Sequence, residues 1–282
     1  MRTEPHVRAY ARFIKLEHTL FSLPLIFAGA VLARRGWPLP ALAALILAAA
    51  AGGRVLAMGL NRIIDADIDR RNPRTQSREL PQGRIRPVEA WGIVAAAGAV
   101  YALSAWAIAP VCLWLSPVPV VLFAVYPYLK RVTALAHLGL GLAWSMAPLG
   151  GWLAGAQSLA GIGEAAWLWA FSVCWLTGFD IIYATMDEAF DRAAGLHSLP
   201  ARLGSRRALL AAAAVHAAAF GCLIMLRRTA LAATPGTLAC LALAGAVFLW
   251  QHAVAGRKPA FAFFELSAAQ GLVILGLVAS GV

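Results

Sequence analysis

Carboxylates at helical spacing are the most chemically informative feature of this 282-residue sequence. Asn61, Asp65 and Asp69 are four residues apart, so on a helix their side chains share one face, with neighbours about 5–6 Å from each other. Asp187 and Asp191 repeat the four-residue step. Because Mg²⁺ typically takes one or two carboxylates together with phosphate oxygens, two such faces predict a site for Mg²⁺ ions and a diphosphate.

A calcium-binding loop is the alternative that the first acidic segment raises. Asp65-Ala-Asp67-Ile-Asp69 has the alternating acids with which an EF-hand loop begins. The sixth position of such a loop is Gly and the twelfth is Glu, but this chain has Arg70 and Gln76 there. The EF-hand interpretation is therefore excluded.

Basic residues surround both acidic segments and favour the same diphosphate chemistry. Arginine and lysine side chains neutralise the charge that develops on a leaving diphosphate. A simpler alternative is that they only mark cytoplasmic loops, which carry an excess of Lys and Arg in membrane proteins. The basic residues concerned are Arg70, Arg71, Arg74, Arg78, Arg84, Arg86, Lys130, Arg131 and Arg202.

The elements that must position these residues are membrane spans. The chain is 61% hydrophobic and 13% charged, with a mean hydropathy of +0.73. Ordinary soluble domains are about 45–50% apolar and about 25% charged, so the composition excludes a soluble domain and a disordered chain. The net charge of +11 would suggest nucleic acid in a soluble chain, whereas in a membrane protein it indicates basic loops. We expect the lipid bilayer as a partner and no nucleic acid.

Apolar runs of bilayer length predict an all-α fold of nine transmembrane helices. A span needs about 20 predominantly apolar residues. Proline, glycine and charged stretches separate the runs, which do not alternate as the strands of a membrane barrel do. The predicted ranges are 16–33, 39–61, 88–108, 111–129, 134–155, 165–186, 208–226, 230–254 and 261–281.

The basic residues select an orientation for these spans. With the N-terminus in the cytoplasm, 19 of the 24 Lys and Arg lie in cytoplasmic segments and 4 in outer segments, and Arg54 lies within a span. Since cytoplasmic loops carry the positive excess, we predict a cytoplasmic N-terminus and an external C-terminus in a bacterial inner (plasma) membrane. Both acidic segments then lie at the cytoplasmic side.

Similar residues follow the two acidic segments, which indicates a weak internal repeat. Leu80-Pro81-Gln82-Gly83-Arg84 follows the first segment and Leu199-Pro200-Ala201-Arg202 follows the second. Asp65 and Asp187 lie 122 residues apart. We expect two half-bundles that enclose a central cavity.

The acidic motifs resemble those of the UbiA family of intramembrane aromatic prenyltransferases. Residues 61–69, with Asn72-Pro73-Arg74-Thr75 and Arg78-Glu79-Leu80-Pro81-Gln82-Gly83 after them, resemble the first aspartate motif of that family. Residues 180–191 resemble the second motif, and residues 126–133 resemble the basic loop between the fourth and fifth helices. The resemblance extends over nearly the whole chain and implies a single domain, residues 1–282.

The resemblance implies a Mg²⁺-dependent enzyme that transfers the prenyl chain of a polyprenyl diphosphate to a small aromatic acid. The catalytic residues, which with Asn61 would also hold Mg²⁺, are Asp65, Asp69, Asp187 and Asp191. Arg62 stands where the family often has Asp, so it is a candidate for contact with phosphate or with an acceptor carboxylate. The residues expected to bind substrate are Asn61, Arg62, Arg74, Arg78, Lys130, Arg131, Asp180 and Tyr183.

The acceptor implied by the resemblance is 4-hydroxybenzoate or a similar acid, in quinone biosynthesis of the ubiquinone or menaquinone type. A dihydroxynaphthoate of a menaquinone pathway is the alternative, because the opening from Lys15 to Pro24 is similar to that branch of the family. His18 in this opening and His197 after the second motif are further candidates for the site, whereas His137 is interpreted as structural.

A membrane transporter is the rival from another functional class. Carboxylates inside a membrane also mark ion pathways, so they do not by themselves identify an enzyme. In transporters, however, such sites lie near the bilayer midplane between broken helices. Here the acids pair at one membrane face, which favours the enzyme.

Overall fold

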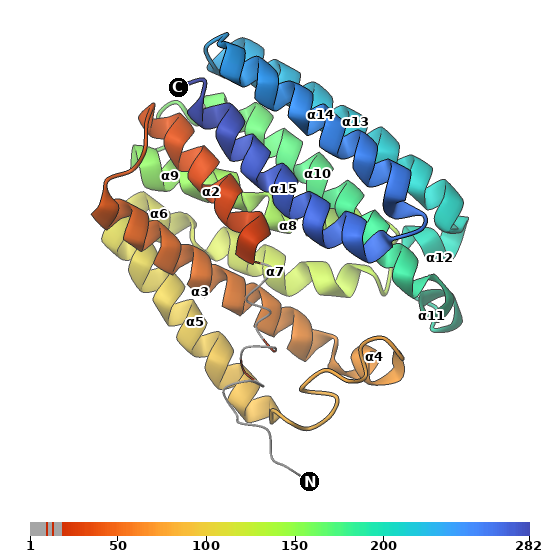
Figure 1. The fold of residues 1–282 in the computed structure, drawn as a ribbon. Helices are drawn as coiled ribbons and strands as arrows, with labels where there is room; N and C mark the ends of the chain where they lie inside the picture. Colours follow the sequence, from red (N-terminus) through yellow and green to blue (C-terminus); the bar gives the residue numbers. More distant parts are fainter. Residues whose placement is uncertain (1–9, 11–12, 14–18) are drawn as a thin grey trace.

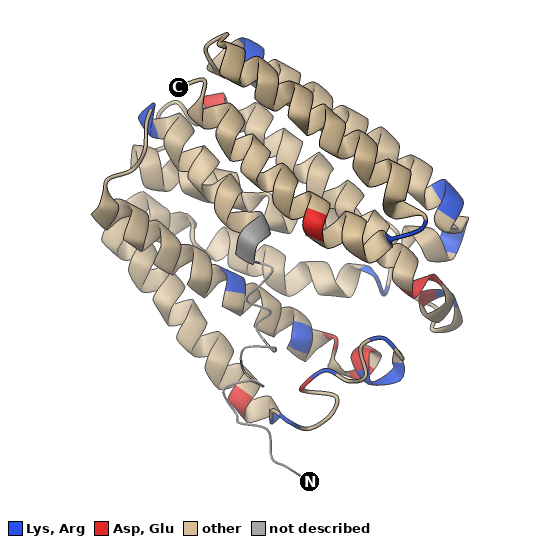
Figure 2. Cartoon of the chain, viewed as in Figure 1, with Lys and Arg blue, Asp and Glu red and all other residues tan. Residues whose placement is uncertain are grey.

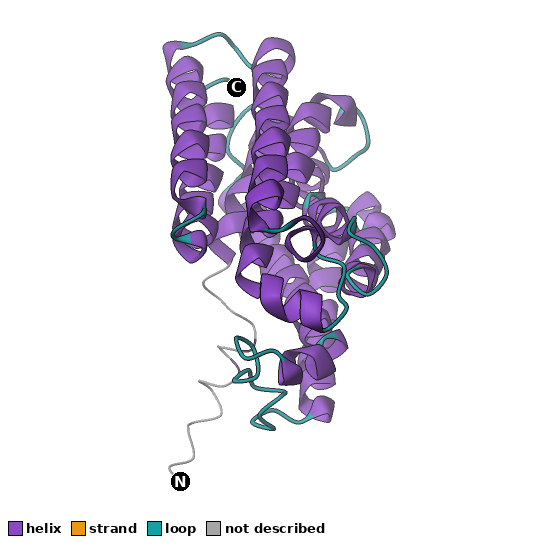
Figure 3. Cartoon of the chain, turned by 90° about the vertical axis from the view of Figure 1, so that its right-hand side faces the viewer, coloured by secondary structure: helices purple, strands orange, loops and turns teal. Residues whose placement is uncertain are grey.

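The computed structural model describes Tyr10, Phe13 and residues 19–282, and within these residues all regular structure is helical (Figures 1 and 3). Six of these helices begin at proline, a residue well suited to the first helical position because its missing N–H has no partner there. The long helices are α2 (Thr19–Arg34), α3 (Pro40–Ile64), α5 (Pro87–Ile108), α10 (Ala166–Ala184), α13 (Ser205–Ala230), α14 (Pro235–Ala255) and α15 (Pro259–Ala279). The shorter elements are α4 (Ala66–Arg71), α6 (Pro110–Leu115), α7 (Pro117–Leu129), α8 (Ala136–Trp144), α9 (Met146–Ala156), η2 (Ile162–Ala165), η3 (Thr185–Asp187), α11 (Glu188–Ala193) and α12 (Leu199–Leu203).

Seven helical segments of the described residues are long and apolar enough to cross a membrane. The predicted spans 16–33 and 134–155 are not among them, so the nine-helix count is not confirmed. The first of these spans provides a shorter apolar helix, Ser22–Arg34, and residues 16–18 lie outside the described residues. The seven segments are Pro40–Ile64, Pro87–Ile108, Pro110–Leu129, Ile162–Ala193, Ser205–Ala230, Pro235–Ala255 and Pro259–Ala279.

Proline explains why the predicted span 134–155 is divided at Ser145 into α8 and α9. Pro148 has no N–H, so it cannot donate the helical hydrogen bond to the carbonyl of Trp144. The predicted span 111–129 is divided at Ser116 between α6 and α7 for a similar reason, since prolines 117 and 119 follow. Apolar composition predicts that a segment is buried in the bilayer, but it does not show where the helix is interrupted.

The helices pack as two groups around separate apolar clusters (Figure 1). α3 packs against α5 and α7 against α8, with Leu56 and Phe123 in their shared core. The larger group packs α2, α10, α13 and α15 around Phe171 and Trp175. Acidic and basic side chains gather at one end of the bundle, where α3 leads into α4 and α10 leads towards α11 (Figure 2). That end holds both acidic motifs.

The crossing of α2 and α9 supplies a prediction about stability. A methyl group on Gly151 would overlap the carbonyl oxygen of Ile26, whereas one on the adjacent Gly150 would meet open space. Overpacking typically costs about 1–3 kcal/mol. We expect Gly151→Ala to lower the apparent melting temperature in detergent by several degrees, and the matched control Gly150→Ala to leave it unchanged. Equal melting temperatures would show that the crossing relaxes without cost.

Candidate active site

Eleven of the twelve site residues expected from the sequence line one cavity of about 240 Å³. It lies between the first motif, on α3 and α4, and the second motif, on α10, η3 and α11. Arg131 is the exception, and its guanidinium lies 3.8 Å from Asp65 at the edge of the site. The expected residues that line the cavity are Asn61, Arg62, Asp65, Asp69, Arg74, Arg78, Lys130, Asp180, Tyr183, Asp187 and Asp191.

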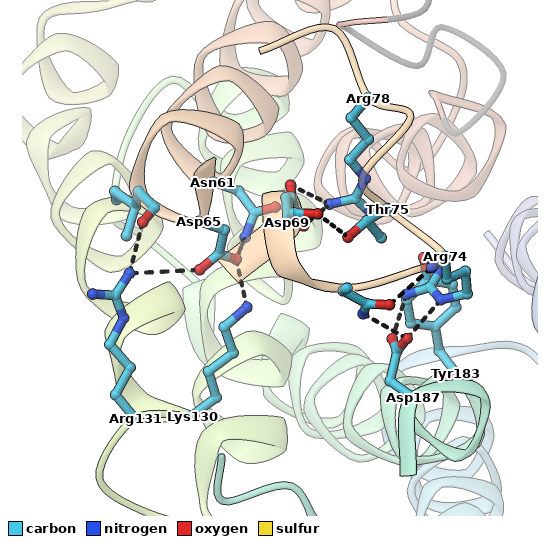
Figure 4. A network of polar contacts seen from close by, with 12 residues as sticks. Asn61, Asp65, Asp69, Arg74, Thr75, Arg78, Lys130, Arg131, Tyr183 and Asp187 are labelled. Carbon is cyan, nitrogen blue, oxygen red and sulfur yellow. Dashed lines mark hydrogen bonds and ion pairs between the residues drawn. The ribbon is translucent and has the colours of Figure 1, made fainter. Parts of the chain in front are cut away.

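Asp65 lies at the junction where α3 ends and α4 begins. Its N–H donates to Asn61 O at 3.0 Å, and the N–H of Asp69 donates to Asp65 O at 2.8 Å, so the four-residue spacing is kept through the junction. Its carboxylate accepts hydrogen bonds at Oδ2 from Asn61 Nδ2 at 3.1 Å and from Lys130 Nζ at 2.6 Å (Figure 4). Oδ1 is buried and has no hydrogen-bond partner among the described residues.

Asp69 is paired with a cation from the loop that follows its own helix. Arg78 Nη1 lies 2.7 Å from both carboxylate oxygens of Asp69. The hydroxyl of Thr75 donates to the backbone carbonyl of Asp69 at 3.3 Å, which holds the loop over the end of α4 (Figure 4). Both Asp65 and Asp69 are almost completely buried.

Asp187 joins the second motif to the loop after the first. Asn72 Nδ2 donates to Asp187 Oδ1 at 2.9 Å, and Arg74 Nε donates to the same oxygen at 2.8 Å. Arg74 also hydrogen-bonds to Asp187 Oδ2 and donates to the hydroxyl of Tyr183 at 2.6 Å (Figure 4). Asn72 is not among the site residues expected from the sequence. A side chain 115 residues from its partner leaves no local signal in the sequence.

The weak repeat of the sequence has a counterpart in the backbone at the two aspartates. Asp65 has φ −93° and ψ 3°, and Asp187 has φ −112° and ψ 6°. Each precedes a six-residue helix that carries another acid of its motif, Asp69 in α4 and Asp191 in α11. The same local bend thus presents an acidic pair from each half of the chain.

Burial and ion pairing act in opposite directions on the charged groups of the first motif. Burial raises the pKa of the Asp65 carboxyl above its ordinary value, and Lys130 opposes that rise. For Arg74, burial lowers the pKa, but the hydrogen bonds to Asp187 outweigh this and raise it above its ordinary value. Arg74 therefore stays charged, and ionised Asp65 depends on the cations that surround it.

Arg54 is a site residue that the sequence analysis left inside a span without a role. Arg54, Met58, Asn61 and Asp65 are spaced four, three and four residues apart along α3, so they share one helix face and line the same cavity. The Arg54 side chain is 8% exposed and lies over the Trp144 ring at 4.3 Å, and its Nε has no hydrogen-bond partner among the described residues. The signal in the sequence was a charged residue within an apolar span, two helical turns before Asn61.

Arg62 is also buried, with Nε and Nη1 lacking hydrogen-bond partners among the described residues. The carboxylates of Asp69 and Glu79 are near enough to stabilise its charge, whereas the neighbouring Arg78 opposes it. Because an uncompensated buried guanidinium is costly, two open donors beside a cavity favour an anionic ligand. The expectation that Arg62 meets phosphate or a carboxylate stays a prediction.

A second, apolar cavity of about 280 Å³ adjoins the charged one. Ser22, Arg54 and Trp144 line both cavities, so they mark the boundary between them. Ile46 and Phe123 are among the apolar residues that line the second cavity. The interrupted helices α6–α7 and α8–α9 also contribute to it, and they bring no acids there.

The remaining histidine predictions have different outcomes. His137 lines the charged cavity and contacts Asp180, so its interpretation as merely structural does not account for its position. The backbone N–H of His197 donates to Lys130 O at 2.7 Å, and a role of its side chain stays a prediction. His18 and the rest of the opening from Lys15 to Glu17 lie outside the described residues.

Comparison with known proteins identifies the family. The model of the UbiA prenyltransferase family matches residues 22–267. The 4-hydroxybenzoate octaprenyltransferase of Shewanella frigidimarina (strain NCIMB 400) is 27% identical over 97% of this chain and 96% of its own length. The 4-hydroxybenzoate solanesyltransferase of Synechocystis sp. (strain ATCC 27184 / PCC 6803 / Kazusa) is 32% identical over 64% of this chain and 60% of its own.

Solved structures share the fold. A UbiA homologue from Aeropyrum pernix K1, in its apo form, has a TM-score of 0.83 and 37% identity over 92% of this chain and 96% of that chain. A UbiA homologue from Archaeoglobus fulgidus bound to GPP and Mg²⁺ has a TM-score of 0.74 and 20% identity over 96% of this chain and 99% of that chain.

The family match extends over most of the chain and agrees with the two acidic motifs around one cavity. The apolar helices make the chain an integral membrane protein, and the relatives are prenyltransferases. The chain therefore belongs to the UbiA prenyltransferase family.

Proposed function

We propose that this enzyme transfers a polyprenyl group from a polyprenyl diphosphate to 4-hydroxybenzoate or a closely similar aromatic acid, with Mg²⁺, in quinone biosynthesis. The observation that carries the proposal is the pair of adjoining cavities, one charged and one apolar, with the buried cation Arg54 at their boundary. The charged cavity suits a diphosphate, the apolar cavity suits a polyprenyl chain, and the buried cation suits the carboxylate of an aromatic acid. The names of the relatives and the GPP and Mg²⁺ bound by the A. fulgidus homologue support it.

The residues present fit Mg²⁺ by their chemistry. Their ligand atoms are carboxylate and amide oxygens, and Asp65 Oδ1 is buried without a hydrogen-bond partner among the described residues. No three acidic, histidine or cysteine side chains converge in the described part of the chain. Mg²⁺ typically takes one or two carboxylates together with phosphate oxygens and water. When bound, Mg²⁺ would neutralise charge on the leaving diphosphate. The residues that would hold it are Asn61, Asp65, Asp69, Asp187 and Asp191.

The cations of the charged cavity would bind the diphosphate. Lys130, Arg78 and Arg74 each lie against a carboxylate of one motif, so positive charges alternate with the acids around the cavity. As the bond from prenyl C1 to the diphosphate oxygen breaks, both electrons go to that oxygen. Fixed cations there stabilise the transition state more than the ground state, which is what raises the rate.

The apolar cavity would hold the prenyl chain and keep water from the allylic cation. A ring carbon of the acceptor then supplies the electron pair for the new carbon–carbon bond, and the hydrogen of that carbon leaves as a proton. Water would trap the cation as an alcohol, so the apolar wall protects the reaction as well as binding the chain.

Arg54 would receive the carboxylate of the acceptor, and this makes a prediction. We expect Arg54→Met to raise the KM for 4-hydroxybenzoate about 10- to 100-fold, because a hydrogen bond to a charged group contributes about 1.5–3 kcal/mol. The KM for polyprenyl diphosphate should stay within about twofold. The uncharged amide 4-hydroxybenzamide is a matched substrate control. Its KM should be higher than that for 4-hydroxybenzoate in the wild type, and the two KM values should be similar in the variant. An unchanged KM for 4-hydroxybenzoate would remove Arg54 from the acceptor site.

The test of the activity itself uses membranes that contain the full chain. Labelled polyprenyl diphosphates of several lengths are incubated with Mg²⁺ and a panel of aromatic acids, including 4-hydroxybenzoate and dihydroxynaphthoates. Labelled product with 4-hydroxybenzoate, lost on addition of EDTA and restored by Mg²⁺, supports the proposal. Product with a dihydroxynaphthoate alone moves the enzyme to a menaquinone pathway, and product undiminished by EDTA contradicts the role of Mg²⁺.

The finer topology is part of the same proposal. We place nine helices across the membrane, with α2 and the divided pair α8–α9 completing the seven long segments, the N-terminus in the cytoplasm and the C-terminus outside. The charged end of the bundle then faces the cytoplasm (Figure 2). Single cysteines introduced at the exposed positions Gln76 and Val282, after the four native cysteines are replaced, test this. The first should react with a membrane-impermeant maleimide only in inverted vesicles, and the second only in intact cells. The reverse pattern contradicts the orientation.

A further inference from the structure

His137 contacts two parts of the second motif at once. On α8, its Nδ1 lies 2.6 Å from Asp180 Oδ2. Its Nε2 accepts the backbone N–H of Leu199, which follows the motif, at 3.0 Å. The ring is buried and lines the charged cavity. One imidazole thus links a carboxylate of α10 to Leu199, the first residue of α12.

These two contacts fix the position of the ring proton. A backbone N–H can only donate, so Nε2 must carry the free lone pair. The proton is then on Nδ1 and is donated to Asp180. The ring is neutral, because a second proton on Nε2 would remove the acceptor for Leu199. This is the opposite tautomer to His216, whose Nε2 faces the carbonyl oxygen of Trp175 at 3.1 Å.

The loop that leads into Leu199 is itself part of the site, because Leu196 and Ser198 line the charged cavity. Its His197 N–H donates to Lys130 O at 2.7 Å, and Lys130 pairs with Asp65 of the first motif. The two hydrogen bonds hold the loop against the α7–α8 segment from both sides of Ser198. His137 therefore holds Asp180 relative to the cations of the charged cavity.

We propose that His137 is a positioning residue that orients Asp180 as the proton acceptor of the reaction, an inference that rests on the proposed function. His137 occupies Oδ2, and among the described residues no other side chain hydrogen-bonds to Asp180, so Oδ1 remains for the acceptor hydroxyl. As the hydroxyl proton passes to Oδ1, the ring carbon becomes more nucleophilic and forms the bond to prenyl C1. The proton displaced from that carbon restores the hydroxyl, and Asp180 releases its own to water, so one proton leaves per prenyl group transferred.

A double-mutant cycle tests the proposal in the full chain reconstituted in nanodiscs. We expect Asp180→Asn to lower kcat about 100-fold, as loss of a general base does. His137→Ala should lower kcat about 10- to 100-fold through misplacement, with the KM for polyprenyl diphosphate within about twofold. His137→Asn, whose amide can donate to Asp180, should recover part of the loss. The double variant His137→Ala/Asp180→Asn should be no slower than Asp180→Asn alone, because His137 acts through Asp180.

A control and a spectroscopic measurement separate positioning from simple stabilisation. His252 Nε2 lies 2.9 Å from His216 Nδ1, and neither histidine lines the charged cavity. His252→Ala should therefore lower thermal stability without changing kcat. Nitrogen-15 NMR of the histidine-labelled wild-type chain should show one ring protonated at Nδ1 that is lost in His137→Asn.

The outcomes distinguish this proposal from the proposed function. A Nε2-protonated or doubly protonated His137 overturns the geometry, and losses that multiply in the double variant overturn the positioning role even though the enzyme is active. If the wild-type chain prenylates no aromatic acid, the proposed function fails and this inference fails with it.

Discussion

Asp65→Ala and Asp187→Ala are each expected to lower prenyl transfer about 1,000-fold, because each removes a carboxylate that would hold Mg²⁺ against the leaving diphosphate. The two residues come from different halves of the chain and occupy equivalent bends. Neither loss can be compensated by the other motif, since both would be needed to enclose one diphosphate. Initial rates with saturating 4-hydroxybenzoate and Mg²⁺ measure the effect.

The first motif supplies its own matched control. Asp67 lies between Asp65 and Asp69 in the sequence, but its side chain is 85% exposed and pairs only on the surface with Arg70. Asp67→Ala should therefore keep activity within about twofold, as surface pairs contribute little. If Asp67→Ala were as inactive as Asp65→Ala, the loss would reflect general damage to the motif. If Asp65→Ala and Asp187→Ala both kept near-normal rates, the two-motif site would be wrong.

Arg74→Met is expected to lower kcat/KM for the polyprenyl diphosphate about 100-fold. Arg74 makes two hydrogen bonds to Asp187 and one to Tyr183, so its guanidinium is fixed between the motifs. Its centre also lies 4.6 Å from the centroid of the Tyr183 ring. A fixed fork of donors suits phosphate oxygens as well as carboxylates. Among the described residues, its removal leaves Asn72 as the side chain that still hydrogen-bonds to Asp187.

Two further variants sharpen this test. Arg74→Lys keeps the positive charge but loses the planar set of guanidinium donors, so it should recover less than a tenth of the lost activity. If charge alone were needed, Arg74→Lys would recover most of it. Arg71→Met removes an exposed arginine three residues earlier, whose one hydrogen bond within the described part of the chain is to the backbone carbonyl of Asp67. It should behave as wild type within about twofold. Full activity of Arg74→Lys would show that the fork is not used.

Local pattern predicts part of this site and misses the rest for a physical reason. The face of Asn61, Asp65 and Asp69 could be predicted because helical spacing alone places residues four apart together. The ion pair of Arg74 with Asp187 could not, because its partners meet only after α3 and α10 have packed with their loops facing each other. Arg54 was visible in the sequence as a charge within a span, but its role depends on the two cavities that meet beside it.

The sequence by itself determined the membrane class, the all-helical fold and the two acidic motifs, because hydropathy and helical periodicity are properties of short segments. Hydropathy did not locate the interruptions at Ser116 and Ser145, because a run of apolar residues has the same hydropathy with or without a break; the prolines nearby were the local signal. Only the tertiary structure decided that the carboxylates are interleaved with cations and that His137 holds Asp180. The contacts of His137 with Asp180 and of Asn72 with Asp187 join residues 43 and 115 positions apart, and only packing brings those residues together.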